Sequence, residues 1–271
     1  MTNLSVSDVL AEDFSAKDLV VTEKETKQIL LDVEAARETA TKTKKAKYPT
    51  MQSIYIYDSE ILNVMKISDS DILKLIFNKS FYNSFMSALN LRNGFSWSMN
   101  DKFFSFIKSN ASISRVVFLN SHISFLRDFI IMEGLMESSD LQNLVVSHKE
   151  LTNTMHKSCI IHLFDLMDQN FASHFVDHPT SDLRKAAYRK LGILNSIEKM
   201  IADPDAEIRL LAARALPYND SRHERFINDR SSKVFTVSLS KIEKSKLPLL
   251  LGSSHLKKPR IKSILSARMT S

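Results

Sequence analysis

Residues 200–216, which read Met-Ile-Ala-Asp-Pro-Asp-Ala-Glu-Ile-Arg-Leu-Leu-Ala-Ala-Arg-Ala-Leu, decide how the carboxy-terminal part of this chain folds. They repeat residues 175–191, Phe-Val-Asp-His-Pro-Thr-Ser-Asp-Leu-Arg-Lys-Ala-Ala-Tyr-Arg-Lys-Leu, at a shift of 25 positions. A third, looser copy begins at Phe226, a further 26 positions along, and a fourth uses residues 249–265. The sequence therefore predicts an internal repeat with a period of 25 to 26 residues.

Each copy encodes a turn between two helices. Proline disfavours helix in the residue before it, so the first helix ends ahead of Pro179 or Pro204. Thr180 and Asp205 stand where a side chain caps the second helix, and an acidic residue follows in its first turn. One such unit cannot bury its apolar face alone, so we expect the copies to stack into an α-solenoid.

The arginine of each copy has a structural explanation. We expect Arg184 and Arg209 to bond the carboxylates or carbonyls of the preceding turn, and we therefore leave them out of the candidate binding surface. In the third copy Arg230 replaces the proline and Phe235 replaces the arginine. Stacking beyond residue 230 is therefore expected to be less regular.

Residues 201–216 resemble the Asp-Pro-x-x-x-Val-Arg-x-x-Ala-x-x-x-Leu signature of HEAT-like repeats. The short period is closer to that of the leucine-rich-repeat variant, which carries the same signature. The resemblance covers about residues 150–271, and we recognise no family in residues 1–140. It implies an α-solenoid that binds other macromolecules, and it implies no particular chemistry because both families are chiefly recognition scaffolds.

Glycine is scarce throughout the chain, with four among 271 residues. This excludes the glycine-built phosphate loop, the dinucleotide-binding turn and the nucleophile elbow, and it disfavours folds rich in β-hairpins. We expect an all-α protein with no cofactor. The single Cys159 cannot form an internal disulfide, and neither a secretory signal nor a membrane-spanning stretch is visible. A cytoplasmic protein in a reducing compartment, without membrane association, follows.

The chain is expected to have three parts. Residues 1–48 form a flexible or partly helical arm, in which 15–21 and 22–43 have helical patterns and Thr22 with Glu25 forms a capping box. Residues 49–140 form a helical domain, with a helix pair at 68–91 that Asp69 or Ser70 caps. Residues 53–57 are either a strand or an apolar segment leading into a helix. Residues 141–271 form the basic, HEAT-like solenoid.

Charge is distributed unevenly. Residues 184–271 carry 19 Lys and Arg against 8 Asp and Glu, a net charge of +11, whereas residues 1–183 carry −5. An acidic partner is plausible for the basic third. The candidate macromolecule-binding surface consists of Arg222, Arg225, Arg230, Lys233, Lys241, Lys244, Lys246, Lys257, Lys258, Arg260, Lys262 and Arg268.

Two further clusters have ordinary explanations. His156, Cys159 and His162, or His174 and His178, share helical spacing, but a zinc site needs about four converging ligands, so we expect no metal. Residues 92–99, which include Trp97, are followed by Lys102, Phe103, Phe104 and Phe106. This mixture of bases and aromatics suits base stacking, but aromatics at such density more often fill a helical core.

These patterns favour a non-enzymatic adaptor or assembly factor that holds a protein partner on a basic solenoid. The alternative is a DNA- or RNA-binding protein whose solenoid cradles the phosphate backbone without reading sequence. An enzyme acting on nucleic acid is a weaker third class, because no spacing of carboxylates, hydroxyls or histidines predicts catalytic residues. The atypical repeats suit a fast-diverging viral or phage protein, and the oligomeric state is open.

Overall fold

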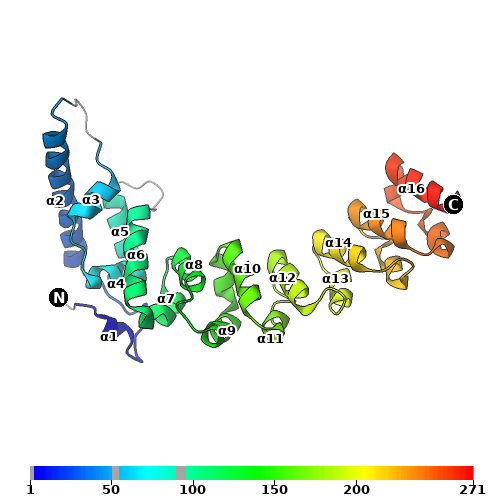
Figure 1. The fold of residues 1–271 in the computed structure, drawn as a ribbon, viewed down its shortest axis with the longest axis horizontal. Coiled ribbons are helices and arrows are strands. Elements are labelled where there is room, and N and C mark those ends of the chain that lie inside the picture. Colours follow the sequence, from blue (N-terminus) through cyan, green and yellow to red (C-terminus); the bar gives the residue numbers. More distant parts are fainter. Residues whose placement is uncertain (1–2, 51–54, 90–95, 271) are drawn as a thin grey trace. The chain divides into compact units, whose positions relative to one another are not determined.

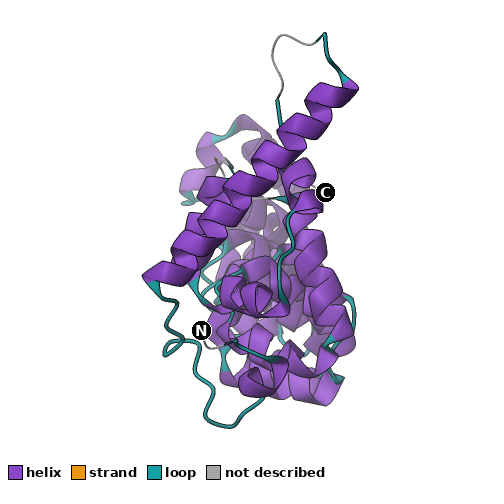
Figure 2. Ribbon diagram, turned by 90° about the vertical axis from the view of Figure 1, so that its left-hand side faces the viewer, coloured by secondary structure: helices purple, strands orange, loops and turns teal. Residues whose placement is uncertain are grey.

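The computed structural model describes residues 3–50, 55–89 and 96–270, and within these ranges every regular element is a helix (Figures 1 and 2). The all-α prediction is therefore confirmed. The chain divides into two compact units, residues 1–159 and 160–271, called unit 1 and unit 2 below. Within the described ranges, no helix combines the length and the apolar composition that crossing a bilayer requires.

Unit 1 is built from short helices and one long one. Its elements are α1 (Val6–Val9), α2 (Glu23–Lys47), α3 (Asp58–Val64), α4 (Asp69–Phe77), α5 (Lys79–Ala88), α6 (Trp97–Ser109), η1 (Ala111–Ile113), α7 (Ser114–Asn120), α8 (Ser124–Met132), α9 (Ser138–Ser147) and η2 (Lys149–Thr154). Helix α10 (Lys157–Leu166) begins at its end.

The long helix α2 packs on α3 and α5, which lie beside it in Figure 1. Thr22 and Glu25 form the expected capping box at its start. Ile29, Val33, Ala36 and Ala40 recur at helical spacing and are buried along one side of it. A flexible arm is thus not confirmed, and residues 15–21, expected as a helix, contain only a turn.

Two ion pairs hold α2 in place. Lys74 of α4 reaches Glu25 at 2.8 Å, and both side chains are largely buried. This ammonium, together with hydrogen bonds from Thr22, lowers the pKa of Glu25 to about 2. Near the other end, Lys44 pairs with Glu60 of α3 at 2.9 Å.

The expected helix pair at 68–91 is confirmed as α4 and α5. Ser68, rather than Asp69 or Ser70, caps α4, because its side chain forms a capping box with Asp71. Asn78 ends α4 and caps α5 through the backbone N–H of Phe81. The strand alternative for 53–57 falls partly on residues 51–54, outside the described ranges, and residues 55–57 lead directly into α3.

Unit 2 is a succession of helix pairs. After the end of α10 its elements are α11 (Gln169–Ser173), α12 (Ser181–Leu191), α13 (Ile197–Ile201), α14 (Ala206–Ala215), η3 (Ser221–Phe226), α15 (Ser232–Lys241), η4 (Lys244–Leu250), η5 (Ser254–Lys257) and α16 (Pro259–Thr270). Helix α11 contacts α12, α13 contacts α14, α14 contacts α15, and α15 contacts α16. The helices that precede α15 and α16 are 3₁₀ helices, in the part of the chain where the repeat signature weakens.

The core of unit 2 repeats with the helices. Ile208, Ala212 and Leu216 are buried with Met200 and Phe226 in one cluster. Phe235, Leu239 and Ile242, which follow at the third copy of the repeat, are buried in the next cluster with Leu250 and Ile261. Asp205 caps α14 by accepting from the backbone of Glu207 at 2.8 Å, whereas Thr180 stands at the same place before α12 without a side-chain cap bond.

An arginine in each of the first two copies joins successive turns. Arg184 donates to the carbonyls of His178 and Pro179 at 2.7 and 2.9 Å, and its guanidinium binds Asp203 through two bonds of 2.8 and 2.7 Å. Its structural role is confirmed. The carbonyls belong to the preceding turn as expected, but the carboxylate belongs to the following turn, because the fork of the guanidinium spans both.

Arg209 makes the same set of bonds one copy later. It donates to the carbonyls of Asp203 and Pro204 and binds the Asp229 carboxylate at 2.6 and 3.0 Å. In the third copy Phe235 occupies the arginine position, and its ring lies 4.9 Å from that of His255. Nε2 of His255 donates to the Asp229 carbonyl at 2.6 Å. An aromatic pair thus replaces the ion pair while the turn-to-turn contact is kept.

We expect Arg184→Ala to lower the free energy of unfolding by about 3–5 kcal/mol, because it leaves the buried Asp203 carboxylate without its partner. Arg189→Ala, at an exposed position of the same helix, should change it by less than about 0.5 kcal/mol. Urea denaturation measures both. Equal losses would contradict a structural role for the buried pair.

Acid should weaken unit 1 through His122. Burial lowers the pKa of this histidine to about 4, and its ring packs edge-on against Tyr82 at 5.1 Å. Because the folded-state pKa lies below the ordinary value near 6.5, the stabilisation is complete above that value and is lost as the pH falls toward 4. His122→Phe keeps a ring and removes the titration, so its melting temperature should fall less over this range. His148→Gln, at a partly exposed histidine, should follow the wild type.

Candidate macromolecule-binding surface

The twelve cations that the sequence predicts as one surface separate into three groups. The first group closes the ends of helices. Lys241 donates to the carbonyls of Arg214 and Leu216 at the end of α14, the latter at 2.8 Å. Arg268 does the same for Leu239 and Ile242 at the end of α15. Because the last carbonyls of a helix lack partners within it, these two residues are structural.

The second group is held by carboxylates. Arg222 lies 2.7 Å from Asp220 and lowers the pKa of that carboxyl to about 2. Arg225 pairs with Glu198, which also lies 3.5 Å from Arg222. Two looser pairs join neighbouring elements, Lys246 with Glu224 at 3.3 Å and Lys233 with Glu207 at 3.5 Å. Such exposed pairs hold their charges weakly.

The third group is exposed and makes no ion pair with any described residue. Its members are Arg230, Lys244, Lys257, Lys258, Arg260 and Lys262. Nζ of Lys258 reaches the hydroxyl of Ser232 at 2.9 Å, which places the start of α16 beside the start of α15. The structure therefore leaves about half of the predicted surface open to a partner.

Most open cations gather where α15 and α16 begin. We define the basic edge as Arg230, Lys233, Lys257, Lys258 and Arg260, which precede these helices or lie in their first turns. Neither helix has an acidic residue in its first turn. Since a helix N-terminus is itself the positive end of the dipole, cations there are unfavourable for the helix and favourable for an anionic ligand.

The first-turn charge has the opposite sign at the equivalent helices of the first two copies, α12 and α14. Helix α12 has Asp182 in its first turn, and α14 has Asp205 as its cap and Glu207 in its first turn. The first-turn charges of the repeat therefore change from acidic to basic between α14 and α15. This change was missed in the sequence, although aligning Asp182, Glu207 and Lys233 at the repeat period displays it.

Three of the predicted histidine and cysteine positions, His156, Cys159 and His178, are engaged in local structure. Cys159 is buried, and burial raises the pKa of its thiol to about 11. Nδ1 of His178 accepts from the backbone of Thr180 at 3.1 Å, and Nδ1 of His156 lies 2.8 Å from the Ser158 hydroxyl. No three His, Cys, Asp or Glu residues in the described ranges are arranged to hold a metal ion.

The aromatic cluster around Trp97 divides between core and surface. Its residues 92–95 lie outside the described ranges. Phe103 and Phe106 are buried, and Phe104 stacks on Phe129 with centroids 4.0 Å apart, so the phenylalanines fill the core. Trp97, at the start of α6, is exposed over 73% of its surface.

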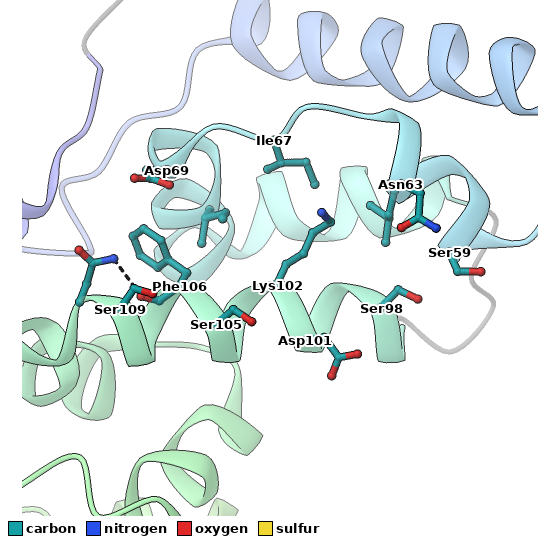
Figure 3. Close-up of a pocket in the computed structure, with 13 residues that line it drawn as sticks. Ser59, Asn63, Ile67, Asp69, Ser98, Asp101, Lys102, Ser105, Phe106 and Ser109 are labelled. Carbon is teal, nitrogen blue, oxygen red and sulfur yellow. Dashed lines mark hydrogen bonds between the residues drawn. The ribbon is translucent and has the colours of Figure 1, made fainter.

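A groove of about 690 Å³ lies in unit 1 among α3, α4 and α6 (Figure 3). The side chain of Lys102 points into it, whereas Asp101 points away. Ser98, Ser105 and Ser109 share the same side of α6, and Ser59 and Asn63 face them from α3. The spacing of Ser98, Lys102, Ser105 and Ser109 by four, three and four positions is the sequence signal for this polar face.

No protein-family model matches the chain, and neither a curated protein nor a solved structure matches it. The function is therefore argued from the residues and their geometry alone.

The division of the cations has a measurable consequence for stability. Lys241→Met should lower the free energy of unfolding by about 1–3 kcal/mol, because the partly buried carbonyls at the end of α14 lose a charged donor. Lys244→Met, at an exposed lysine three residues away, should leave stability within about 0.5 kcal/mol of wild type. Thermal denaturation of the two variants separates a structural lysine from a surface one, and similar melting temperatures would contradict the assignment.

Proposed function

We propose that the chain is a non-enzymatic adaptor or assembly factor whose basic edge holds an acidic segment of a protein partner. In this proposal unit 2 is a short HEAT-like solenoid, the recognition scaffold that its repeat signature implies. The basic edge carries the proposal, because it brings five cations to two adjacent helix N-termini that have no acidic residue in their first turns.

Three features of unit 2 support the solenoid. The α11–α12 pair joins the α13–α14 pair through Tyr188 and Arg184, and α14, α15 and α16 then contact one another in chain order. Arg184 and Arg209 make the same bonds one repeat apart, as expected when identical units are stacked by the same operation. The last helix, α16, buries Ile261 and Leu265, while Lys262, Ser263 and Ser266 on it are exposed, so its outer side is polar. A polar outer face is typical of terminal repeats.

The energetics of the basic edge support a binding role. Cations at a helix N-terminus oppose the dipole, at a cost of about 0.3–1 kcal/mol each. The helix-capping Lys241 and Arg268 stand instead at helix C-terminal ends, where a cation is favourable. Lys257, Lys258 and Arg260 thus do not stabilise the helix that they precede or begin. An acidic ligand would relieve their repulsion and gain from both helix dipoles.

The change of sign along the repeat favours a compact acidic segment over a nucleic-acid duplex. A phosphate backbone that followed the stack would pass from the basic edge onto Glu207, Asp205 and Asp182. Neighbouring helices pack at about 8–10 Å, so an acidic peptide a few residues long spans the two basic helix ends. Of these carboxylates only Glu207 borders that span, and Lys233 pairs with it at 3.5 Å. The phosphate-cradle alternative remains as an outcome of the experiment.

The proposal is tested with the full-length protein and a fluorescent peptide rich in Asp and Glu, followed by anisotropy at low salt. A Lys257→Gln/Lys258→Gln/Arg260→Gln variant should bind roughly 3- to 100-fold more weakly, if each exposed charge contributes about 0.2–1 kcal/mol. The matched control, Lys185→Gln/Arg189→Gln/Arg214→Gln, removes the same charge from α12 and α14 and should bind as wild type.

Two results would overturn the proposal. If both triple variants lose the same affinity, net charge rather than the basic edge holds the peptide. If duplex DNA binds and the peptide does not, unit 2 recognises a phosphate backbone. A protein partner from the native source should in addition remain bound after nuclease treatment.

A further inference from the structure

Among the described residues of unit 1, the most exposed aromatic side chains stand at the starts of α3 and α6. Tyr55, Tyr57 and Trp97 are exposed over 71%, 57% and 73% of their surfaces, respectively. Large rings normally contribute to stability by being buried, whereas most of the surface of each of these three rings is open to solvent. The phenylalanines nearby in the sequence, Phe103 and Phe106, are buried as expected.

Two contacts bring the segments that carry the three rings together. The rings of Tyr55 and Tyr57 meet edge to face with centroids 5.0 Å apart. The hydroxyl of Ser96 donates to the carboxylate of Asp58, which joins the start of α6 to the start of α3. Trp97 and Tyr57 are each one residue from this hydrogen bond. Ser59 follows Asp58 in α3, and Ser98 follows Trp97 in α6. Both serines lie at the same end of the groove in Figure 3.

The C-terminal end of α2 supplies positive charge beside these rings. Nζ of Lys44 donates to the carbonyl of Tyr55 at 2.8 Å, lies 4.9 Å above the ring of Tyr57, and pairs with Glu60. This lysine fixes the backbone of the aromatic segment. Lys45 and Lys47, in the same helical turn, are exposed and make no ion pair with any described residue. Glu60 is paired with Lys44, and the carboxylate of Asp58 accepts from Ser96 and forms no ion pair with either lysine.

We propose that this aromatic–lysine patch, formed by Tyr55, Tyr57, Trp97, Lys45 and Lys47, binds single-stranded nucleic acid. Exposed rings provide faces on which unpaired bases stack, and every base has such a face, so the binding tolerates any sequence. Lys45 and Lys47 neutralise phosphates of the same strand. A duplex does not fit this chemistry, since its bases are already stacked on each other.

The site is separate from the basic edge in sequence and in chemistry. The basic edge is built from cations and helix N-termini without an exposed aromatic residue among its members, whereas the patch depends on rings and has only two open lysines. An adaptor with both sites would hold a single strand on unit 1 and an acidic protein segment on unit 2. Each site is tested by its own variants.

Trp97 is the only tryptophan of the chain, so its fluorescence reports on the patch directly. Titration of the full-length protein with an oligothymidylate of about ten nucleotides should quench this fluorescence. With two phosphates neutralised, the logarithm of the association constant should fall against the logarithm of salt concentration with a slope of about −1.4. Lys45→Gln/Lys47→Gln should bring that slope close to zero.

Tyr57→Ala should weaken oligothymidylate binding roughly 5- to 100-fold, the range typical for loss of one stacked base. Tyr218→Ala removes an exposed tyrosine (71%, against 57% for Tyr57) from unit 2 and should leave binding unchanged. Circular dichroism checks that both variants keep the helical content of the wild type, which is expected because both side chains are exposed.

An abasic oligonucleotide of the same length keeps the phosphates and removes the bases, so it should not quench Trp97. Equal quenching by the abasic strand would overturn stacking. A blue shift with anionic phospholipid vesicles and no response to oligothymidylate would assign the patch to a membrane surface instead. Loss of oligothymidylate binding in the Lys257→Gln/Lys258→Gln/Arg260→Gln variant would move the strand to the basic edge. If that variant binds the strand normally, the proposal for the patch stands even when the acidic peptide does not bind the basic edge.

Discussion

Unit 2 depends on one arrangement, an arginine whose guanidinium spans two successive turns. Arg184 binds the carbonyls of the turn before its own helix and the Asp203 carboxylate of the turn after it. Asp203 in turn offers its carbonyl to Arg209, which reaches Asp229. The turns at Asp203 and Asp229 are therefore each positioned by the arginine of the preceding copy. Five donors in a rigid fork suit this task, and a lysine would satisfy only part of it.

The third copy shows which feature of that arrangement is essential. Phe235 and His255 keep the contact between turns with a ring pair, and His255 takes over the bond to the Asp229 carbonyl. The equivalent backbone carbonyl is thus satisfied in each of the first three copies, whereas the ion pair is replaced in the third. This agrees with the general cost of burying an unpartnered polar group, which exceeds the gain from any one partner chosen to satisfy it.

The cations of unit 2 divide according to which end of a helix they approach. Lys241 and Arg268 approach C-terminal ends and complete the hydrogen bonding of the helix before them. Lys257, Lys258 and Arg260 approach an N-terminal end, where the same charge is unfavourable for the helix. Some cations of this region therefore stabilise the fold, and others are exposed and open to a partner. In unit 1 the aromatic residues divide similarly, between a phenylalanine core and exposed rings at the start of α3 and α6.

The sequence alone determined the helical class, the repeat and the structural role of Arg184 and Arg209, because helix periodicity, caps and turn prolines act within a few residues. It also determined the capping box of Thr22 with Glu25. Local signals were less reliable where a neighbouring side chain competed, as when Ser68 rather than Asp69 or Ser70 capped α4. Only the tertiary structure decided that Arg184 and Arg209 bind carboxylates of the following turn, Asp203 and Asp229, rather than of the preceding turn. It also decided that α2 packs on α3 and α5. It alone separated Lys241 from Lys244 and joined the start of α6 to the start of α3 through Ser96 and Asp58. A charge or a ring acquires its role from groups that lie far away along the chain.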